Sequence, residues 1–162
     1  MPLLVDGNNL IYAMAEVDRE LSRAAMVEWI HFYCQQAGEA GHVVFDGPEP
    51  PGDLPAQIAA FADVQVSFSG HAAADRIILD CIAGDSAPKR LIVVSTDREI
   101  RTAAQRRRCQ SVRSEDFARL LVKKRNQPPA PEPVEPEEKR RGLDPEQTRK
   151  WMREFGYEPP ER

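Results

Sequence analysis

The sequence predicts an α/β fold in which a mostly parallel sheet of about five strands lies between layers of helices. Two observations predict this class. Short β-branched runs alternate with longer stretches that have helical apolar spacing, a pattern typical of βαβ units with right-handed crossovers. One run, Leu91-Ile92-Val93-Val94, is continuously apolar, as expected of a strand covered on both faces. The 41% apolar and 30% charged content is ordinary for a globular protein, so a hydrophobic core is expected.

Each predicted strand is a short run that ends in small or polar residues. The expected strands are Leu3–Asp6, His42–Asp46, Val64–Phe68, Leu91–Ser95 and Cys109–Val112. Helical spacing between them predicts a helix around residues 26–37, a short helix at 54–62, and further helices around 77–82, at 98–107 and at 115–125.

The composition changes after residue 126, which predicts the end of the folded domain. Residues 127–143 are rich in Pro and Glu and have little to bury, so we expect a disordered linker. Residues 144–156 predict a short amphipathic helix, with Trp151 and Phe155 on one face, and residues 157–162 a flexible end. A helix of this length is marginal alone, so it packs on the domain or docks on a protein or ribonucleoprotein partner. The sequence leaves both open.

Charge and cysteine content narrow the class of protein. Residues 1–89 carry 4 basic and 13 acidic side chains, whereas residues 90–127 carry 11 basic and 4 acidic ones. An acidic part that attracts cations, next to a basic part that attracts phosphates, suits a metal-dependent nuclease. No signal peptide or membrane span is evident, and the three cysteines lack metal-site spacing. We therefore expect a cytoplasmic protein with reduced thiols and no membrane partner.

Carboxylates follow three of the predicted strands. Asp6 ends the first strand, Asp46 the second, and Asp97 follows the fourth. Ligands of open parallel sheets bind outside the carboxyl ends of the strands, so these acids are expected at one edge. Carboxylates crowded together need a cation, and hard oxygen ligands favour Mg²⁺ or Mn²⁺.

A fourth acid, Asp75, lies near the start of the helix after the third strand. Helical spacing places Asp75 on the buried face of this helix and Asp80 on its solvent face. Each acid also has a structural alternative. Asp46 fits the polar start of a loop, Asp97 fits a first-turn acid, and Thr96 with Glu99 fits a capping box. Asp6, in Asp-Gly-Asn-Asn, is the hardest to explain structurally.

Several segments resemble the YacP-like branch of the NYN domains, which belong to the PIN-like ribonucleases. Leu3 to Ile11 resembles the DGxN signature of the family, and Val43 to Asp46 its second strand. Ala74-Asp75 is similar to its Ala-Asp helix start, Val94 to Asp97 to its fourth strand end, and Ser114 to Phe117 to its last helix start. The likeness spans residues 1 to about 125.

The resemblance implies a PIN-like, Rossmann-type three-layer domain with metal-dependent endoribonuclease activity. Metal-site roles would fall on Asp6, Asp75 and Asp97, with a supporting role for Asn9 and a weaker transfer to Asp46. One departure is Arg76, where YacP-like sequences often carry a second acid.

The expected mechanism is in-line attack by a metal-bound water on the scissile phosphate. Beside the metal ligands, the side chains expected to contact the substrate or water are Asn9, Ser95, Thr96, Arg98, Arg101 and, less strongly, His71. The basic runs Arg106 to Arg108 and Lys123 to Arg125 are further candidates for the RNA backbone, although solvated helix ends explain them equally well.

Two competing classes are weighed against this one. No GxGxxG or P-loop motif follows the first strand, so no nucleotide cofactor is expected. The stronger rival is a catalytically degenerate RNA-binding module that recruits a partner through the helix of Trp151 and Phe155. Arg76 favours this rival, and the presence of Asp6, Asp75 and Asp97 opposes it.

Overall fold

The structure is a computed structural model that describes residues 2–17 and 19–127. A division by contacts separates Met1–Gln127 from Pro128–Arg162. The linker and the helix expected at 144–156 lie outside the described residues, as do Trp151 and Phe155, so these expectations stay predictions.

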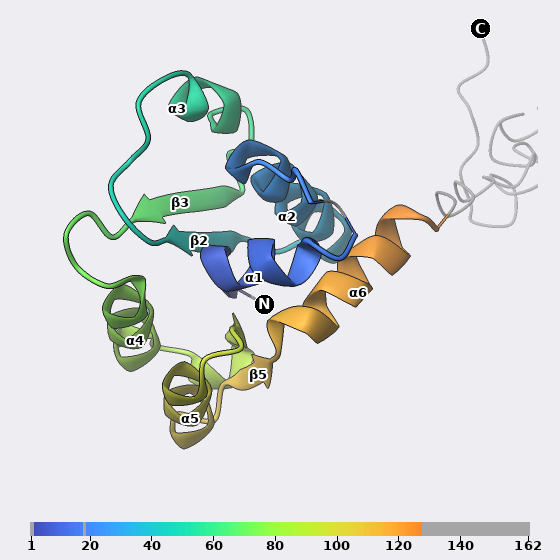
Figure 1. The fold of residues 1–162 in the computed structure, drawn as a ribbon. Coiled ribbons are helices and arrows are strands. Elements are labelled where there is room, and N and C mark those ends of the chain that lie inside the picture. Colours follow the sequence, from blue (N-terminus) through green and yellow to red (C-terminus); the bar gives the residue numbers. More distant parts are fainter. Residues whose placement is uncertain (1, 18, 128–162) are drawn as a thin grey trace, which may run out of the picture. The chain divides into compact units, whose positions relative to one another are not determined.

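Strands and helices alternate along the described chain, as the sequence predicts (Figure 1). The strands are β1 (Leu3–Asp6), β2 (Gly41–Phe45), β3 (Val64–Phe68), β4 (Ile92–Val94) and β5 (Gln110–Val112). The helices are α1 (Gly7–Met14), α2 (Arg23–Ala37), α3 (Leu54–Ile58), α4 (Ala74–Gly84), α5 (Arg98–Arg106) and α6 (Ser114–Arg125), with a 3₁₀ turn at Pro88–Arg90.

The sheet has five strands in the order β3-β2-β1-β4-β5, and all its pairs are parallel. The chain builds outward from β1 through β2 to β3, then returns to the other side of β1 for β4 and β5. The strand order therefore reverses between β1 and β4, where Leu3 pairs with Ile92 and Val5 with Val94. In parallel sheets this reversal is where ligands bind.

Helices cover both faces of the sheet, so the domain has three layers (Figure 1). The side chains of β1 alternate between the two faces: Leu3 and Val5 pack with residues of α1, α2 and α6, whereas Leu4 packs with residues of α4 and α5. These side chains are 2% exposed or less. The expected α/β fold with a parallel sheet of five strands is confirmed.

The sequence did not predict α1, which begins directly after β1. Gly7 starts this helix and lies under the ring of Phe45 on β2. A Cβ at Gly7 would lie 2.5 Å from Phe45 Cδ1 and 3.0 Å from Val43 Cγ1. The absent side chain of Gly7 therefore lets α1 approach the sheet closely, and this contact fixes the direction of the chain just after Asp6.

The other bounds differ from the expected ones by small amounts. The short helix α3 ends at Ile58 and not at residue 62. Strand β4 is two residues shorter than expected and β5 one residue shorter. All three cysteines are free, as expected; Cys34 and Cys109 are buried and Cys81 is partly buried. Burial raises the pKa of the Cys34 thiol to about 11, so it is protonated at neutral pH. Among residues 2–17 and 19–127, no helix is both long and apolar enough to span a bilayer.

Candidate functional site

The point where the strand order reverses is occupied by Asp6 and Ser95. Asp6 is the last residue of β1 and is 3% exposed, and Ser95, which follows β4, is fully buried. The Ser95 hydroxyl donates a hydrogen bond of 3.2 Å to Asp6 Oδ2 and accepts one of 3.0 Å from the amide of Asp97. One hydroxyl group thus joins the two halves of the sheet at the carboxyl edge.

Asp6 also caps α1. Its Oδ1 accepts a hydrogen bond of 3.0 Å from the backbone amide of Asn9, and its Oδ2 is contacted by the side-chain amide of Asn9. These bonds satisfy one of the free amides at the helix start. Asn9 therefore positions the Asp6 carboxylate, consistent with the supporting role that the resemblance implies.

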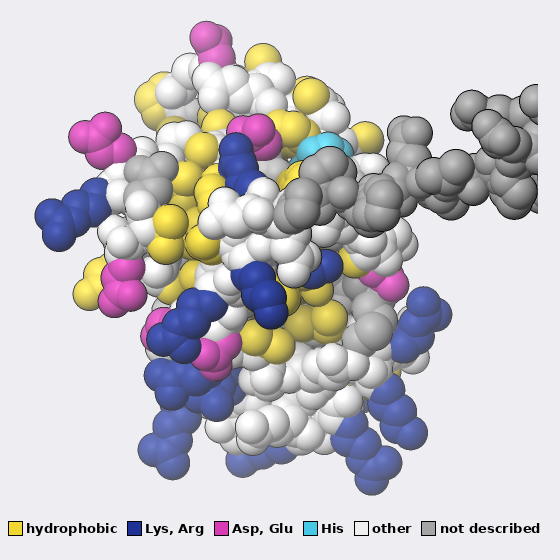
Figure 2. All heavy atoms as spheres, turned by 90° about the vertical axis from the view of Figure 1, so that its right-hand side faces the viewer, with side chains coloured by type: hydrophobic (Ala, Val, Ile, Leu, Met, Phe, Trp, Pro, Cys, Tyr) yellow, Lys and Arg dark blue, Asp and Glu magenta, His cyan; other side chains and the backbone are white. Residues whose placement is uncertain are grey.

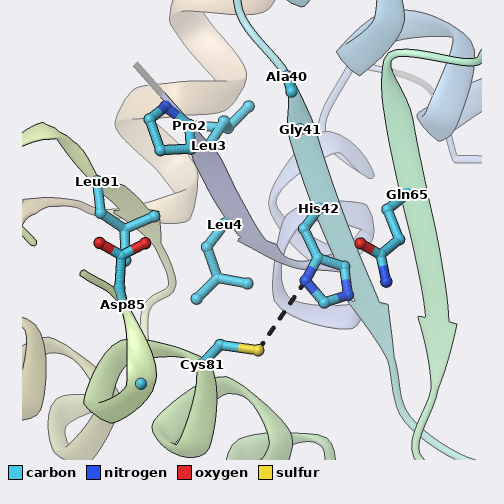
Figure 3. Close-up of a pocket in the computed structure, with 11 residues that line it drawn as sticks. Pro2, Leu3, Leu4, Ala40, Gly41, His42, Gln65, Cys81, Asp85 and Leu91 are labelled. Carbon is cyan, nitrogen blue, oxygen red and sulfur yellow. Dashed lines mark hydrogen bonds between the residues drawn. The ribbon is translucent and has the colours of Figure 1, made fainter. Parts of the chain in front are cut away.

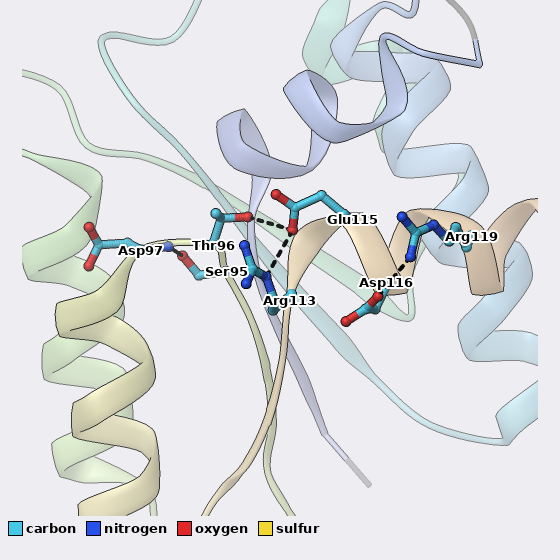
Figure 4. A network of polar contacts seen from close by, with 7 residues as sticks. All are labelled: Ser95, Thr96, Asp97, Arg113, Glu115, Asp116 and Arg119. Atoms are coloured by element: carbon cyan, nitrogen blue, oxygen red, sulfur yellow. Dashed lines mark hydrogen bonds and ion pairs between the residues drawn. The ribbon is translucent and has the colours of Figure 1, made fainter.

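Asp97 caps α5 in the same way. Its Oδ1 accepts hydrogen bonds from the amides of Glu99 (2.7 Å) and Ile100 (3.0 Å), while its Oδ2 has no hydrogen bond to any described residue. The capping box predicted for Thr96 and Glu99 is wrong, because Asp97 is the N-cap. Thr96 instead donates to Glu115 at the start of α6, with 3.1 Å between Oγ1 and Oε2 (Figure 4).

The contact with Thr96 belongs to a small network that holds α6 against the end of β4 (Figure 4). Glu115 also pairs with Arg113, with 3.5 Å between Oε2 and Nε. The pKa of Glu115 is lowered, first by a hydrogen bond from its own backbone amide and then by Thr96 and Arg113. Glu115 therefore stays ionised and ties Thr96 to α6, on the side of Thr96 away from Asp97 in Figure 4.

Asp46 follows β2 and contacts the start of α4. Its Oδ1 accepts hydrogen bonds from the Ser69 hydroxyl (3.0 Å) and from the amide of Ala74 (3.2 Å), the first residue of α4. Asp46 is exposed, and its Oδ2 has no hydrogen bond to the described residues. Asp6 and Asp97 are therefore the N-caps of α1 and α5, whereas Asp46 binds the first amide of α4 from outside that helix; each of the three uses Oδ1.

The fourth acid, Asp75, shows that the carboxylates lie near one another. Its pKa is raised, first by partial burial of its carboxyl group and then by the negative charges of Asp97, Asp6, Asp46 and Glu99, in that order. The residue as a whole is exposed at the start of α4, and Ile78, one turn later, is fully buried. No basic group in the described chain offsets this repulsion strongly enough to lower the pKa of Asp75.

The expected phosphate-binding residues lie on α5 and in the loop before α4. Arg98 and His71 are exposed. Arg101 is partly buried, and its Nε has no hydrogen-bond partner in the described structure. Figure 2 shows most Lys and Arg side chains of one face in its lower half, at the height of α4 and α5 in Figure 1. The Lys and Arg side chains visible on this face are therefore concentrated in one part of the surface.

Sequence reasoning missed Arg23, the first residue of α2. Its guanidinium carbon lies 5.2 Å from the centre of the Phe45 ring and 5.7 Å from that of Phe68, and Nη2 donates a 3.3 Å hydrogen bond to the carbonyl of Asp46. A cation is thus fixed beside the acidic edge. The only signal for Arg23 in the sequence was that it is one of 4 basic residues among the first 89.

A hollow of about 450 Å³ lies at the opposite edge of the sheet, where the strands begin (Figure 3). His42 and Cys81 point toward each other there, with 4.0 Å between Nδ1 and Sγ. Burial lowers the pKa of His42 and raises that of Cys81, so both are neutral at pH 7. The hollow is mainly apolar in its lining and holds none of the four acids.

Residues 3–155 match the family described as the YacP-like NYN domain. The chain belongs to this family. The parallel sheet of five strands, with Asp6 at the end of β1, is the arrangement that the sequence resemblance led us to expect. No curated protein matches the chain significantly.

Among the solved structures that resemble this NYN domain are two of Rae1. The crystal structure of Rae1 (YacP) from Bacillus subtilis is 21% identical, with a TM-score of 0.63 and coverage of 96% of this chain and 84% of Rae1. The crystal structure of its W164L mutant is 22% identical, with a TM-score of 0.57 and 75% of each chain covered. At this level of identity the likeness establishes the fold.

Whether a divalent ion fits this edge depends on its ligand number. No group of three or more His, Cys, Asp or Glu side chains in residues 2–17 and 19–127 is arranged to enclose a metal. Mg²⁺, however, is usually bound by one or two carboxylates, with waters and substrate phosphates as its other ligands. Asp75 and the free Oδ2 of Asp97 supply oxygen ligands of this kind, and the raised pKa of Asp75 marks a place where a cation is favourable. The residues therefore suit a magnesium or manganese ion in the kind of ligand that they offer.

Proposed function

We propose that this NYN domain is a metal-dependent endoribonuclease whose active site lies at the carboxyl edge of the sheet. The proposal is supported above all by the electrostatics of Asp75: partial burial, and then the negative charges of acids that follow three strands, raise the pKa of this carboxyl group at the start of α4. Such repulsion costs stability, and a hard divalent cation removes it. Membership of the YacP-like NYN family supports the same activity.

In this proposal Asp75 and Asp97 hold Mg²⁺ or Mn²⁺, with Asp6 as the third acid of the site and Asp46 at its margin. The bound ion would act as a Lewis acid on the scissile phosphate and lower the pKa of an attacking water. Asn9 and Ser95 keep the Asp6 carboxylate in a fixed position through hydrogen bonds.

The basic side chains have a separate role, which is to hold the RNA backbone. Arg98 and Arg101 follow Asp97 on the first turns of α5, so they are available for phosphates next to the cleaved bond. Contacts of this type position an RNA chain without selecting its sequence. His71 is exposed in the loop before α4, and we assign it a minor phosphate contact at most.

The rival function, a catalytically inactive RNA-binding module, is favoured by two observations. Asp6 and Asp97 each have a structural role as a helix N-cap, and Asp46 accepts a hydrogen bond from the first amide of α4. Arg76, the neighbour of Asp75, adds a positive charge where the family often has an acid.

An RNA cleavage assay separates the two functions. An end-labelled single-stranded RNA is incubated with the full chain in Mn²⁺, in Mg²⁺ or in chelator. We expect cleavage only with metal, and a loss of about 100-fold or more in Asp75→Asn and Asp97→Asn, because each removes several kcal/mol of metal and phosphate stabilisation. Asp80→Asn is the matched control, since Asp80 is an exposed acid on the same helix as Asp75. Equal cleavage in chelator, or undiminished cleavage by both site variants, would reject the proposal.

A further inference from the structure

A second hollow, of about 380 Å³, lies beside the candidate active site and is lined by side chains of α1 and by the first residue of α2. Its lining residues are Asn8, Ile11, Tyr12, Ala15 and Arg23. This volume is at the small end of the range for ligand pockets in proteins, which is about 300–1,000 Å³. None of these residues is part of the site described above, apart from the backbone contact of Arg23 with Asp46.

Tyr12 is the most exposed large hydrophobic side chain among the described residues, at 84% exposure. The neighbouring residues Leu10 and Met14 are fully buried in the core below α1. Tyr12 is two positions from each, about 200° around the helix by the usual 100° per residue, so its ring projects away from the core. The fold therefore does not need this aromatic ring for packing, and the ring is available to a ligand.

Arg23 forms the other wall of the hollow, and its position is fixed. The guanidinium lies over the rings of Phe45 and Phe68 and donates to the carbonyl of Asp46. A planar guanidinium that is held in this way binds phosphate oxygens and stacks on flat ring systems. The hollow thus combines an exposed aromatic ring with a fixed positive charge.

Two lining residues of the hollow connect it to the residues of the acidic edge. Asn8 lies between Gly7 and Asn9, and Asn9 contacts Asp6. Arg23 contacts the residue that follows β2. A nucleic-acid chain whose phosphate lies at the acids would therefore place its neighbouring nucleotide between α1 and the start of α2.

We infer that the hollow between Tyr12 and Arg23 binds one unpaired base of a single-stranded RNA, next to the phosphate at the acidic edge. This inference rests on the proposed endoribonuclease function. Proteins that bind single strands combine positive charge with aromatic rings on which successive bases stack. Bases inside a duplex are already stacked and do not offer both faces, so the site selects single-stranded over double-stranded RNA.

Equilibrium binding in chelator tests the inference without cleavage. The probe is a short single-stranded RNA that carries one 2-aminopurine, a base whose fluorescence falls when it stacks. We expect Tyr12→Ala to raise the Kd about 5- to 150-fold, the range for loss of one base–aromatic stack. Tyr12→Phe keeps the ring and should bind as the wild type does. The control is Phe32→Ala, which removes another partly exposed aromatic ring, nine residues beyond Arg23 on α2. Thermal melts check that each variant is folded.

The outcomes are distinct. Tyr12→Ala with an unchanged Kd, or Tyr12→Phe as weak as Tyr12→Ala, overturns the inference, as does a duplex of the same sequence that binds equally well. A Tyr12→Ala variant that alters sedimentation but not RNA binding assigns the ring to a second copy of the chain and also overturns it. Parallel cleavage assays in Mn²⁺ test the proposed function separately: if the wild type binds through Tyr12 but does not cleave, the base site stands and the nuclease proposal fails.

Discussion

Substitution of Asp6 and Asp97 by Asn should inactivate the site in both cases but destabilise the fold in only one. Asp6 is buried, and its Oδ2 accepts from the Ser95 hydroxyl and from the Asn9 side chain. In Asp6→Asn an NH₂ group replaces that oxygen. The partly exposed Asn9 amide can turn over and accept, but the hydroxyl proton of the fully buried Ser95 loses its acceptor.

A buried hydrogen-bond donor that is left without an acceptor lowers the free energy of unfolding by about 1–3 kcal/mol. For a unit of the size of Met1–Gln127, unfolding entropy converts this to a fall in Tm of about 4–11 °C. In Asp97→Asn the remaining oxygen still caps α5, because Asn is as good an N-cap as Asp, and the replaced oxygen has no partner in the described structure. Its free energy of unfolding should stay within about 0.5 kcal/mol of the wild type.

Circular dichroism melts and urea titrations in chelator measure both variants without interference from bound metal. The expected order of Tm is Asp97→Asn equal to wild type, with Asp6→Asn clearly lower. If the two variants melt together, the Ser95 hydroxyl does not depend on Asp6 as described, and the account of the sheet's central hydrogen bond is wrong.

Three further predictions concern single positions. Gly7→Ala should lower the free energy of unfolding by about 1–3 kcal/mol, because its Cβ would overlap the Phe45 ring. Gly84→Ala is the control and should be neutral or stabilising, because the space around Gly84 is open. If a urea titration gives the two variants equal stability, α1 does not approach the sheet as closely as described. Asp75→Asn should raise Tm in chelator, because it removes a repelled charge, and should abolish any stabilisation by added Mn²⁺; a lower Tm would show that Asp75 is favourably paired. Burial lowers the pKa of His42 below its ordinary value of 6.5, so the unfolded chain binds a proton at a higher pH than the folded chain does. The free energy of unfolding should therefore fall as the pH drops below about 6.5. A His42→Gln variant with the same slope of stability against pH would exclude His42 as the cause.

The sequence predicts the sheet well because the strands bury both faces. Continuous apolar runs as short as Leu91 to Val94 are typical of buried strands, and the observed strands start and end within about a residue of the expected positions. Helix α1 escaped prediction because Gly7, Asn8 and Asn9 are weak helix formers. Two features of the sequence do indicate α1: an N-cap at Asp6, and the apolar residues Leu10 and Met14 four positions apart. They can be recognised only once the end of the preceding strand is known.

The candidate site was predictable in its acids but not in their hydrogen bonds. That Asp6, Asp46 and Asp97 follow strands can be seen in the sequence, and parallel topology brings such positions to one edge. The local pattern fits a cap at Thr96 as well as one at Asp97; the choice depends on Glu115, which is 19 residues away from Thr96 and binds it. Arg23 is a similar case, since its position depends on two rings from different strands.

Only one of the two carboxylate oxygens of Asp97 caps α5, and this has a consequence for how the sequence can evolve. Asn caps a helix as well as Asp does, so a one-letter codon change at this position removes the charge and leaves the fold intact. Asp6 has no such freedom, because both of its oxygens accept hydrogen bonds in a buried place. A descendant that abandons catalysis should therefore lose the acid at position 97 early and keep the acid at position 6 for structural reasons alone. An aspartate retained at the end of the first strand is for that reason a poor indicator of activity, and position 97 is the better one.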